Sequence, residues 1–238
     1  MIEFVERSDV GRHYLHERRV RLSDAGPDGR LRADGLARYL QDVAGDDWDD
    51  TGVTSEDTWV VRRTTVRVAA GGRWPLLGEQ VTLTTWCAGW GAAWAERRTD
   101  VAVAGETVIE CAALWVPIDP TGHPLRLRDE FFQVYAEAAQ GRKVSGRVRV
   151  VPIPEGAERR PWSFRRADLD IVGHVNNAVQ WAPLADIART QVKYASWIHR
   201  GPIEAEDQVV LAFDNAHLWL LVDNSVRVAG EFRVEGAH

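Results

Sequence analysis

The residues best suited to chemistry lie close together between positions 168 and 177. This short segment contains two carboxylates, an imidazole, two amides and a glycine: Asp168, Asp170, His174, Asn176, Asn177 and Gly173. A carboxylate can activate water or attack a carbonyl, and backbone N–H groups at a helix start can stabilise developing negative charge. Such a density of polar groups where a loop enters a helical pattern indicates a functional site.

Within this segment, Asp170 can supply the base or nucleophile. Gly173 permits a backbone conformation that a substrate can approach closely. The predicted substrate-binding and oxyanion amides belong to Gly173, Val175, Asn176 and Asn177. Structural roles stay open for some of these residues, because Asp168 can cap a turn and either asparagine can be the helix N-cap.

Composition limits what the rest of the chain can be. Its 238 residues, 45% hydrophobic and 27% charged, suit one large or two small globular domains. The charged N-terminus and the lack of long apolar runs predict a cytoplasmic protein. A net charge of −6 argues against nucleic-acid binding. Cys87 and Cys111 are predicted to be buried thiols, and the histidine spacing predicts no metal or other cofactor.

Three pairs of similar segments occur in the same order along the chain. Residues 24–31 precede an apolar helical pattern as residues 168–175 do, residues 78–81 resemble 206–209, and residues 101–106 resemble 226–231. Together they predict two copies of one unit, each built as loop, helix and strands.

The periodicity predicts the elements of both copies. In the first copy we expect a helix after Asp34 as N-cap, followed by strands at 59–68, 80–87, 93–103 and 107–116. A bridge at 126–158 contains a helix at 127–139 and a strand-like stretch at 144–151. The second copy is expected to have an opening strand at 162–167, a helix at 177–193 kinked or started as a 3₁₀ turn by Pro183, and strands at 196–200, 208–214, 218–221 and 225–234. The predicted domains are 1–125 and 159–238.

This organisation resembles an α+β tandem, or double, hotdog fold, with two long helices each wrapped by a curved antiparallel β-sheet. Residues 168–177 resemble the D-x-D-x-x-G-H-V-N-N segment of hotdog thioesterases. This segment and five others are together similar to the acyl-acyl carrier protein thioesterases of plants and bacteria. The five are residues 21–24, 38–44, 59–64, 84–87 and 114–116. The resemblance implies hydrolysis of fatty acyl thioesters on acyl carrier protein in fatty acid biosynthesis.

The resemblance also implies roles for residues. It assigns catalysis to Asp170 and His174. In the repeat these two residues align with Gly26 and Arg30, so one active site per chain is expected, and the first copy would hold the acyl chain. Candidate tunnel or core residues there are Trp48, Trp59, Trp86, Trp90 and Trp94. Acyl carrier protein is acidic, and the arginines expected to dock it are Arg159, Arg160, Arg165 and Arg166.

Two positions depart from the plant enzymes. Val172 stands where they have an asparagine, a pattern that looks like single-hotdog acyl-CoA thioesterases. Their Glu-Cys pair aligns with Ile203 and Glu204, which leaves Glu204 as a speculative catalytic helper and no catalytic cysteine.

Acyl-CoA hydrolysis and non-catalytic acyl binding therefore remain alternatives, and a homodimer is also compatible with the sequence. A hotdog hydratase motif, D-x-N-P-x-H, fits less well because Asp170 and His174 are four apart without an intervening Asn-Pro.

Overall fold

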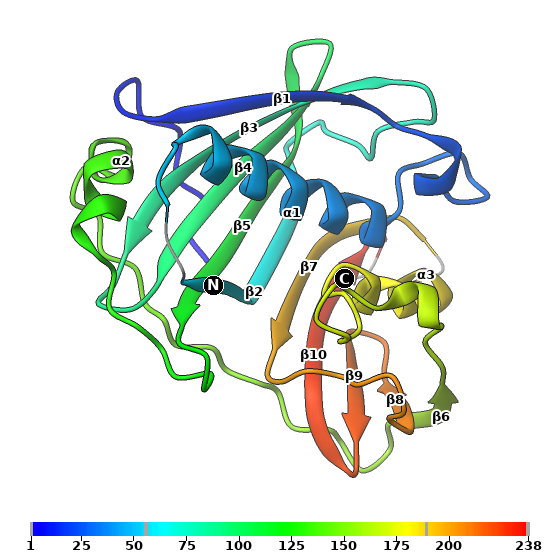
Figure 1. Cartoon of the computed structure of the whole chain (residues 1–238). Coiled ribbons are helices and arrows are strands. Elements are labelled where there is room, and N and C mark those ends of the chain that lie inside the picture. Colours follow the sequence, from blue (N-terminus) through cyan, green and yellow to red (C-terminus); the bar gives the residue numbers. More distant parts are fainter. Residues whose placement is uncertain (1, 55–56, 189, 237–238) are drawn as a thin grey trace.

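The computed structural model describes residues 2–54, 57–188 and 190–236. Ten antiparallel strands form one sheet in the order β1-β3-β4-β5-β2-β7-β10-β9-β8-β6 (Figure 1). The first five are β1 (His13–Arg19), β2 (Thr58–Val68), β3 (Gln80–Trp90), β4 (Ala95–Val103) and β5 (Glu106–Ile118). The second five are β6 (Glu158–Trp162), β7 (Val192–His199), β8 (Val209–Phe213), β9 (His217–Val222) and β10 (Ser225–Val234).

The sheet consists of two units with the same strand order. β1-β3-β4-β5-β2 in the first half corresponds to β6-β8-β9-β10-β7 in the second. The halves join where β2 pairs with β7, from Arg63 opposite Ile198 to Arg67 opposite Tyr194. We call this junction the seam. The duplicated topology is the tandem hotdog arrangement that the sequence predicts.

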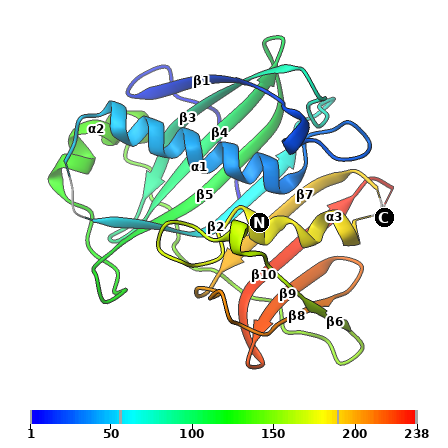
Figure 2. The ribbon, with the colours of Figure 1, turned by 45° about the vertical axis from the view of Figure 1, so that its right-hand side comes forward.

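The first unit contains the long helix α1 (Ala33–Asp50), which crosses the sheet on one face (Figure 2). Its predicted apolar face is confirmed, because Leu36, Tyr39 and Val43 are buried against the sheet. The predicted N-cap is wrong. Arg32 is the N-cap residue, and the Asp34 carboxylate lies in the first turn, where it accepts hydrogen bonds from Arg32 at 2.9 Å and Arg38 at 3.0 Å.

The second long helix predicted at 177–193 is not formed. A 3₁₀ turn, η3 (Val179–Trp181), precedes a short helix, α3 (Pro183–Ile187). Pro183 lacks the N–H that a continuous helix needs, so it begins a new helix at its N1 position, and the predicted 3₁₀ start is confirmed. Val192 already pairs with Val234 of β10, which assigns the end of the predicted helix to a strand.

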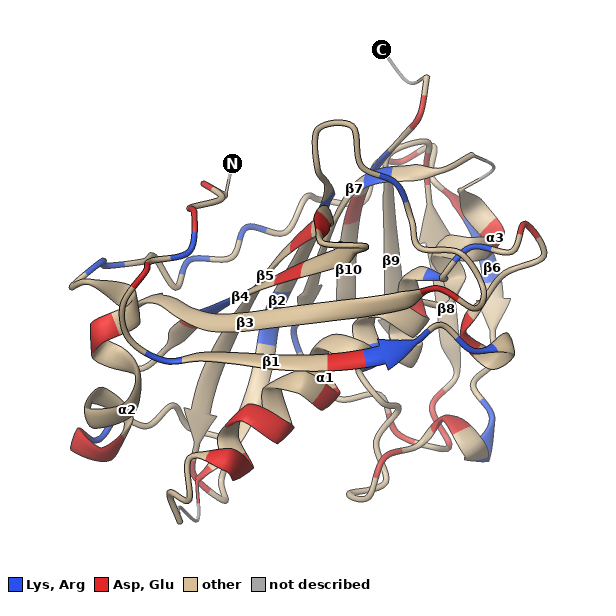
Figure 3. Cartoon of the chain, turned by 90° about the horizontal axis from the view of Figure 1, so that it is seen from above, with Lys and Arg blue, Asp and Glu red and all other residues tan. Residues whose placement is uncertain are grey.

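Charged contacts attach the edge strand β1, which the sequence pattern did not predict, to α1. Arg18 pairs with Asp42 at 2.6 Å, and Arg12 pairs with Asp47 and Asp50, each at 2.6 Å. Figure 3 shows acidic residues spaced along α1 beside β1. Asp47 is 1% exposed, because it also binds Arg97 from β4 at 2.6 Å.

Three further predictions are corrected. The bridge contains the predicted helix, α2 (Asp129–Ala139), but residues 144–151 form no strand. The opening strand of the second unit is β6, at Glu158–Trp162, and residues 163–165 are irregular. The similarity of 101–106 to 226–231 is not structural: Ala104 and Gly105 form the β4–β5 turn, whereas Gly230 lies inside β10. The corresponding turn of the second unit is Asp223-Asn224, where both residues also have positive φ.

Candidate active site

The loop from Asp168 to Asn177 folds into a tight turn on the helix side of the sheet. The Asp170 N–H donates to the His174 carbonyl at 2.8 Å, and the Gly173 N–H donates to the Asp170 carbonyl at 3.1 Å. Gly173 has φ +87°, a left-handed conformation that side chains disfavour. An isolated β-bridge pairs Leu169 with Val175 and closes the base of the turn.

The Asp170 carboxylate is oriented by its own turn. Its Oδ1 atom accepts hydrogen bonds from the N–H groups of Val172 at 3.0 Å and His174 at 3.1 Å. Across residues 2–54, 57–188 and 190–236, no protein group donates to its Oδ2 atom. One oxygen therefore fixes the side chain, and the other is free to accept a proton or attack a carbonyl carbon.

His174 and Glu204 come together although 30 positions apart in the chain. Nε2 of His174 lies 3.3 Å from Oε1 of Glu204, and the two residues form a β-bridge. The Glu204 N–H donates to Asp207 Oδ2 at 2.7 Å, which holds the backbone of Glu204 in place. The imidazole is 39% and the carboxylate 55% exposed, so both can reach a bound substrate.

Of the four predicted oxyanion amides, three are engaged within the protein. The N–H groups of Gly173, Val175 and Asn176 donate to the carbonyls of Asp170, Ile203 and Asp168. Asn177 is the exception, since its N–H has no acceptor within the part of the chain that the structure describes. A backbone donor at this position can face the carbonyl oxygen of a substrate.

The two flanking polar residues are structural. Asp168 is 6% exposed and accepts from the Arg165 N–H at 2.7 Å, which confirms the expected turn cap. Hydrogen bonds from the Arg165 guanidinium lower the pKa of Asp168 despite its burial. Asn176 holds the turn before η3, because its Oδ1 accepts from the Ala178 N–H at 2.8 Å. The N-cap residue of η3 is Ala178, so the expected asparagine N-cap is not formed.

A buried polar network behind the loop was not predicted. The Gln180 side chain is 1% exposed and donates from Nε2 to the Val175 carbonyl at 2.9 Å. Its Oε1 lies 2.8 Å from Nδ1 of His199, which is 5% exposed. Burial lowers the pKa of His199 to about 3, so this imidazole is neutral. The network fixes the backbone between Gly173 and Asn177; an isolated Gln and His in apolar sequence gave no signal of it.

The first unit contains the same turn without the chemistry. Its Gly26 N–H donates to the Arg30 carbonyl at 2.8 Å and its Gly29 N–H to the Gly26 carbonyl at 2.9 Å, as in the second loop. An isolated β-bridge pairs Arg30 with Leu76 in the first unit, as one pairs His174 with Glu204 in the second. Gly26, Arg30 and Leu76 therefore occupy the places of Asp170, His174 and Glu204.

A cavity of about 280 Å³ lies between α1 and the sheet of the first unit. Two of the predicted tryptophans, Trp48 and Trp59, line it together with Trp115, Phe131 and Tyr135. Trp86 and Trp90 are core residues, and Trp94 donates from Nε1 to the Val144 carbonyl in the bridge. Because η3 also packs on α1, that helix connects the cavity with the loop of the second unit.

The cysteines and the predicted docking arginines have distinct surroundings. Cys87 and Cys111 are buried free thiols, as predicted, and burial raises the pKa of Cys87 to about 11.

Of the arginines predicted to dock a carrier, Arg165 is engaged by Asp168 at 2.7 Å and Arg160 by Asp186 at 3.2 Å. Arg159 and Arg166 are exposed.

Fold and loop together define a tandem hotdog protein in which one of two equivalent turns places Asp170 and His174 where the other has Gly26 and Arg30. A sequence model of the acyl-ACP thioesterase N-terminal domain matches residues 11–135, more than half of the chain. The protein belongs to the acyl-ACP thioesterase family, and its class of activity is thioester hydrolysis. No helix among the described residues is long and apolar enough to cross a membrane.

Relatives and solved structures agree with this assignment. An uncharacterized protein of Mycobacterium tuberculosis is 26% identical over 98% of this chain and 96% of its own. A structure from Lactobacillus plantarum, provisionally named an oleoyl thioesterase, matches with a TM-score of 0.77 at 18% identity over 94% of this chain and 96% of that one. The 12:0-ACP thioesterase of Umbellularia californica matches with a TM-score of 0.75 at 18% identity over 93% and 94%. At these identities the structures support the fold.

Proposed function

We propose that this protein hydrolyses fatty acyl thioesters carried on acyl carrier protein, releasing a free fatty acid and the carrier thiol. The supporting observation is the asymmetry between the two loops. The same turn occurs twice, yet only the second combines a carboxylate with an unengaged oxygen and a histidine 3.3 Å from a glutamate. A carboxylate and an imidazole at positions that hold Gly26 and Arg30 in the other copy of a repeated turn point to chemistry rather than to folding.

Asp170 supplies the base in this proposal. Its Oδ2 removes a proton from water as the water oxygen bonds to the thioester carbonyl carbon, and the developing oxyanion accepts a hydrogen bond from the Asn177 N–H. The C–S bond then breaks, and the thiol leaves with a proton. His174 donates to the substrate, and Glu204 positions the imidazole.

The acyl chain would occupy the cavity beneath α1 in the first unit. Five aromatic side chains line it, which suits an apolar chain. The ion pair of Asp47 with Arg97 lies beside it, with Tyr135 donating to Asp47 at 2.9 Å. This buried polar group would limit how far a chain can extend. Arg159 and Arg166, exposed in and after β6, would meet an acidic carrier.

The decisive experiment is thiol release from purified protein with matched substrates. Acyl-carrier and acyl-CoA thioesters of one chain length should both be tested, with chain length varied next. We expect turnover of the carrier substrate, with a Michaelis constant that rises with salt and in a double variant Arg159→Glu/Arg166→Glu. Faster hydrolysis of acyl-CoA without a salt effect would make acyl-CoA the substrate, and binding without turnover would reduce the protein to an acyl-binding one.

A further inference from the structure

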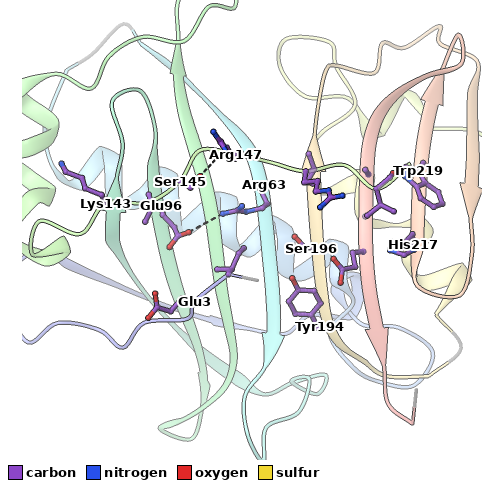
Figure 4. A pocket seen from close by; sticks show the side chains of 18 of the residues that line it. Glu3, Arg63, Glu96, Lys143, Ser145, Arg147, Tyr194, Ser196, His217 and Trp219 are labelled. Carbon is purple, nitrogen blue, oxygen red and sulfur yellow. Dashed lines mark hydrogen bonds and ion pairs between the residues drawn. The ribbon is translucent and has the colours of Figure 1, made fainter. Parts of the chain in front are cut away.

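A second cavity, about 450 Å³, lies across the seam (Figure 4). Arg63 of β2 and Ser196 of β7 line it. These residues alternate with Thr64 and Trp197, and Trp197 stacks on Trp181 of η3 at 4.5 Å on the helix side. Because successive side chains of a strand point to opposite faces, the cavity lies on the face away from the helices and from Asp170. We call it the outer groove.

The bridge forms one wall of the outer groove and is fixed at both ends. The Val144 N–H donates to the Trp90 carbonyl at 3.1 Å, and the Val151 carbonyl accepts from Trp219 Nε1 at 2.9 Å. Between these anchors, a Cβ on Gly146 would lie 2.7 Å from the Trp94 ring, so the chain passes in close contact there. The path of the bridge places its exposed arginines along the groove.

Positive charge exceeds negative charge in the outer groove. Its cations are Arg63, Arg142, Lys143, Arg147 and Arg149, and its carboxylates are Glu3, Glu96 and Glu231. Glu96, with a side chain 4% exposed, is shared by three guanidinium groups: Arg98 at 3.1 Å, Arg142 at 3.3 Å and Arg63 at 3.6 Å. Within the described residues, neither Arg147 nor Arg149 has an ion-pair partner.

Arg63 is the most buried of these cations, and its only partner among the described residues is Glu96. Its side chain is only 14% exposed, yet in the part of the chain that the structure describes it donates no hydrogen bond, and its buried Nε has no partner. A buried guanidinium that donates no hydrogen bond is costly, and burial accordingly lowers the pKa of Arg63. Unpaired buried donors in a native protein call for a functional explanation.

We propose that the outer groove binds a small phosphorylated molecule through Arg63, Arg147 and Arg149. Guanidinium groups match phosphate oxygens with paired hydrogen bonds, and several cations on two walls suit more than one phosphate charge. The hydroxyl groups of Tyr194 and Ser196 add donors, and Ile198 and Val151 provide apolar surface for an organic part. This ligand is not the thioester, because the sheet separates the groove from Asp170.

Calorimetric titration with inorganic pyrophosphate at constant ionic strength tests the proposal. We expect saturable binding to the wild-type chain at about one equivalent, weakened tenfold or more in Arg63→Met and several-fold in Arg147→Gln. Arg67→Met is the matched control: Arg67 is on the same strand and face but pairs with Glu110 at 2.7 Å outside the groove, and this variant should bind like the wild type.

Folding and ligand identity are controlled separately. Replacing a poorly paired buried arginine by an apolar residue of similar length is tolerated in proteins, and thermal unfolding will verify it for Arg63→Met. Arg147 is exposed, so its variant keeps the test valid if Arg63→Met fails to fold. Three outcomes would overturn the proposal. The wild-type chain could show no saturable binding, both groove variants could bind pyrophosphate with wild-type affinity, or the chain could bind octanoate in place of pyrophosphate. None of these outcomes depends on thioesterase activity.

Discussion

At the scale of residues, one turn serves two purposes. The Asp170 carboxylate uses Oδ1 to hold the turn and keeps Oδ2 for chemistry. The sequence predicted Asp170 from the chemistry of its carboxylate and His174 through the resemblance to hotdog thioesterases. It could not predict which amide stays unengaged, because the acceptor of the Val175 N–H comes from Ile203, far along the chain.

Asp170→Asn should lose about 10²-fold or more in turnover, because an amide cannot take a proton from water. Its side-chain oxygen can still accept the two turn hydrogen bonds, so the unfolding temperature should stay near that of the wild type. Asp28→Asn is the control, since Asp28 Oδ1 caps the first turn by accepting from the Arg30 N–H at 3.0 Å. Steady-state thiol release measures both, and near-normal turnover in Asp170→Asn would remove this residue from catalysis.

Glu204→Gln should have a smaller effect than His174→Ala. The His174–Glu204 pair is partly exposed, and such pairs contribute about 1 kcal/mol or less, which corresponds to roughly fivefold in rate. A loss as large as that of Asp170→Asn would instead make Glu204 a catalytic residue.

At the scale of elements, the two helices differ because of local sequence. α1 could be predicted, since its apolar spacing runs for four turns without proline, whereas Pro183 ends any long helix in the second unit. The strand β1 escaped prediction because its alternation includes the polar residues Arg18, Glu17 and His16. Besides its pairing with β3, ion pairs with α1 hold β1 in place, and strand periodicity cannot show these contacts.

Gly45→Ala should raise the free energy of unfolding by about 0.5–1 kcal/mol, the helix-propensity difference between the two residues. A Cβ there meets nothing within 4 Å. In Gly35→Ala, on the same helix, the new Cβ would lie 3.0 Å from both the Asp24 carbonyl oxygen and a Leu31 methyl, which should cancel or reverse the gain. Urea unfolding of the two variants distinguishes these effects; equal gains would contradict the packing at Gly35.

His199 on β7 should make stability depend on pH between about 4 and 6.5. Its pKa is lowered from 6.5 to about 3 by burial, with Arg62 adding repulsion, so the unfolded chain binds a proton more readily. The contribution is fully present above about pH 6.5 and is lost as the pH falls toward 3. Lowering the pH from 7.5 to 5.5 should cost about 1.4 kcal/mol through this group.

Denaturant unfolding at both pH values measures this dependence. His199→Gln should flatten it, because the substitution removes the buried imidazole whose pKa burial lowers. An unchanged slope in His199→Gln would place the titrating group elsewhere.

At the scale of the whole molecule, duplication could be predicted from two of the three repeated segments. The loops at 24–31 and 168–175 share hydrogen bonds, and Glu79 and Asp207 hold equivalent turns by accepting from the N–H groups of Leu76 and Glu204, each at 2.7 Å. The seam could not be predicted. Strand periodicity does not show that β2 and β7 are the edge strands through which the two halves of the sheet pair.

If the first unit binds the acyl chain and the second hydrolyses the thioester, a change in the first unit should alter the Michaelis constant without altering turnover. Ala44→Phe narrows the cavity under α1 and should raise the Michaelis constant for long acyl chains several-fold, with little change for short ones. Turnover of short substrates should stay near normal, since the loop of the second unit is untouched. Equal effects on all chain lengths would indicate that the acyl group binds elsewhere.

Covalent linkage through the bridge has an evolutionary consequence. In a dimer of identical subunits, each substitution appears at two symmetry-related positions, so a residue that one site needs cannot be lost from the other. Here the two positions are encoded separately. Gly26 and Arg30 could therefore diverge from Asp170 and His174 while both turns kept the same backbone hydrogen bonds. One shared sheet thus carries two independently evolving halves.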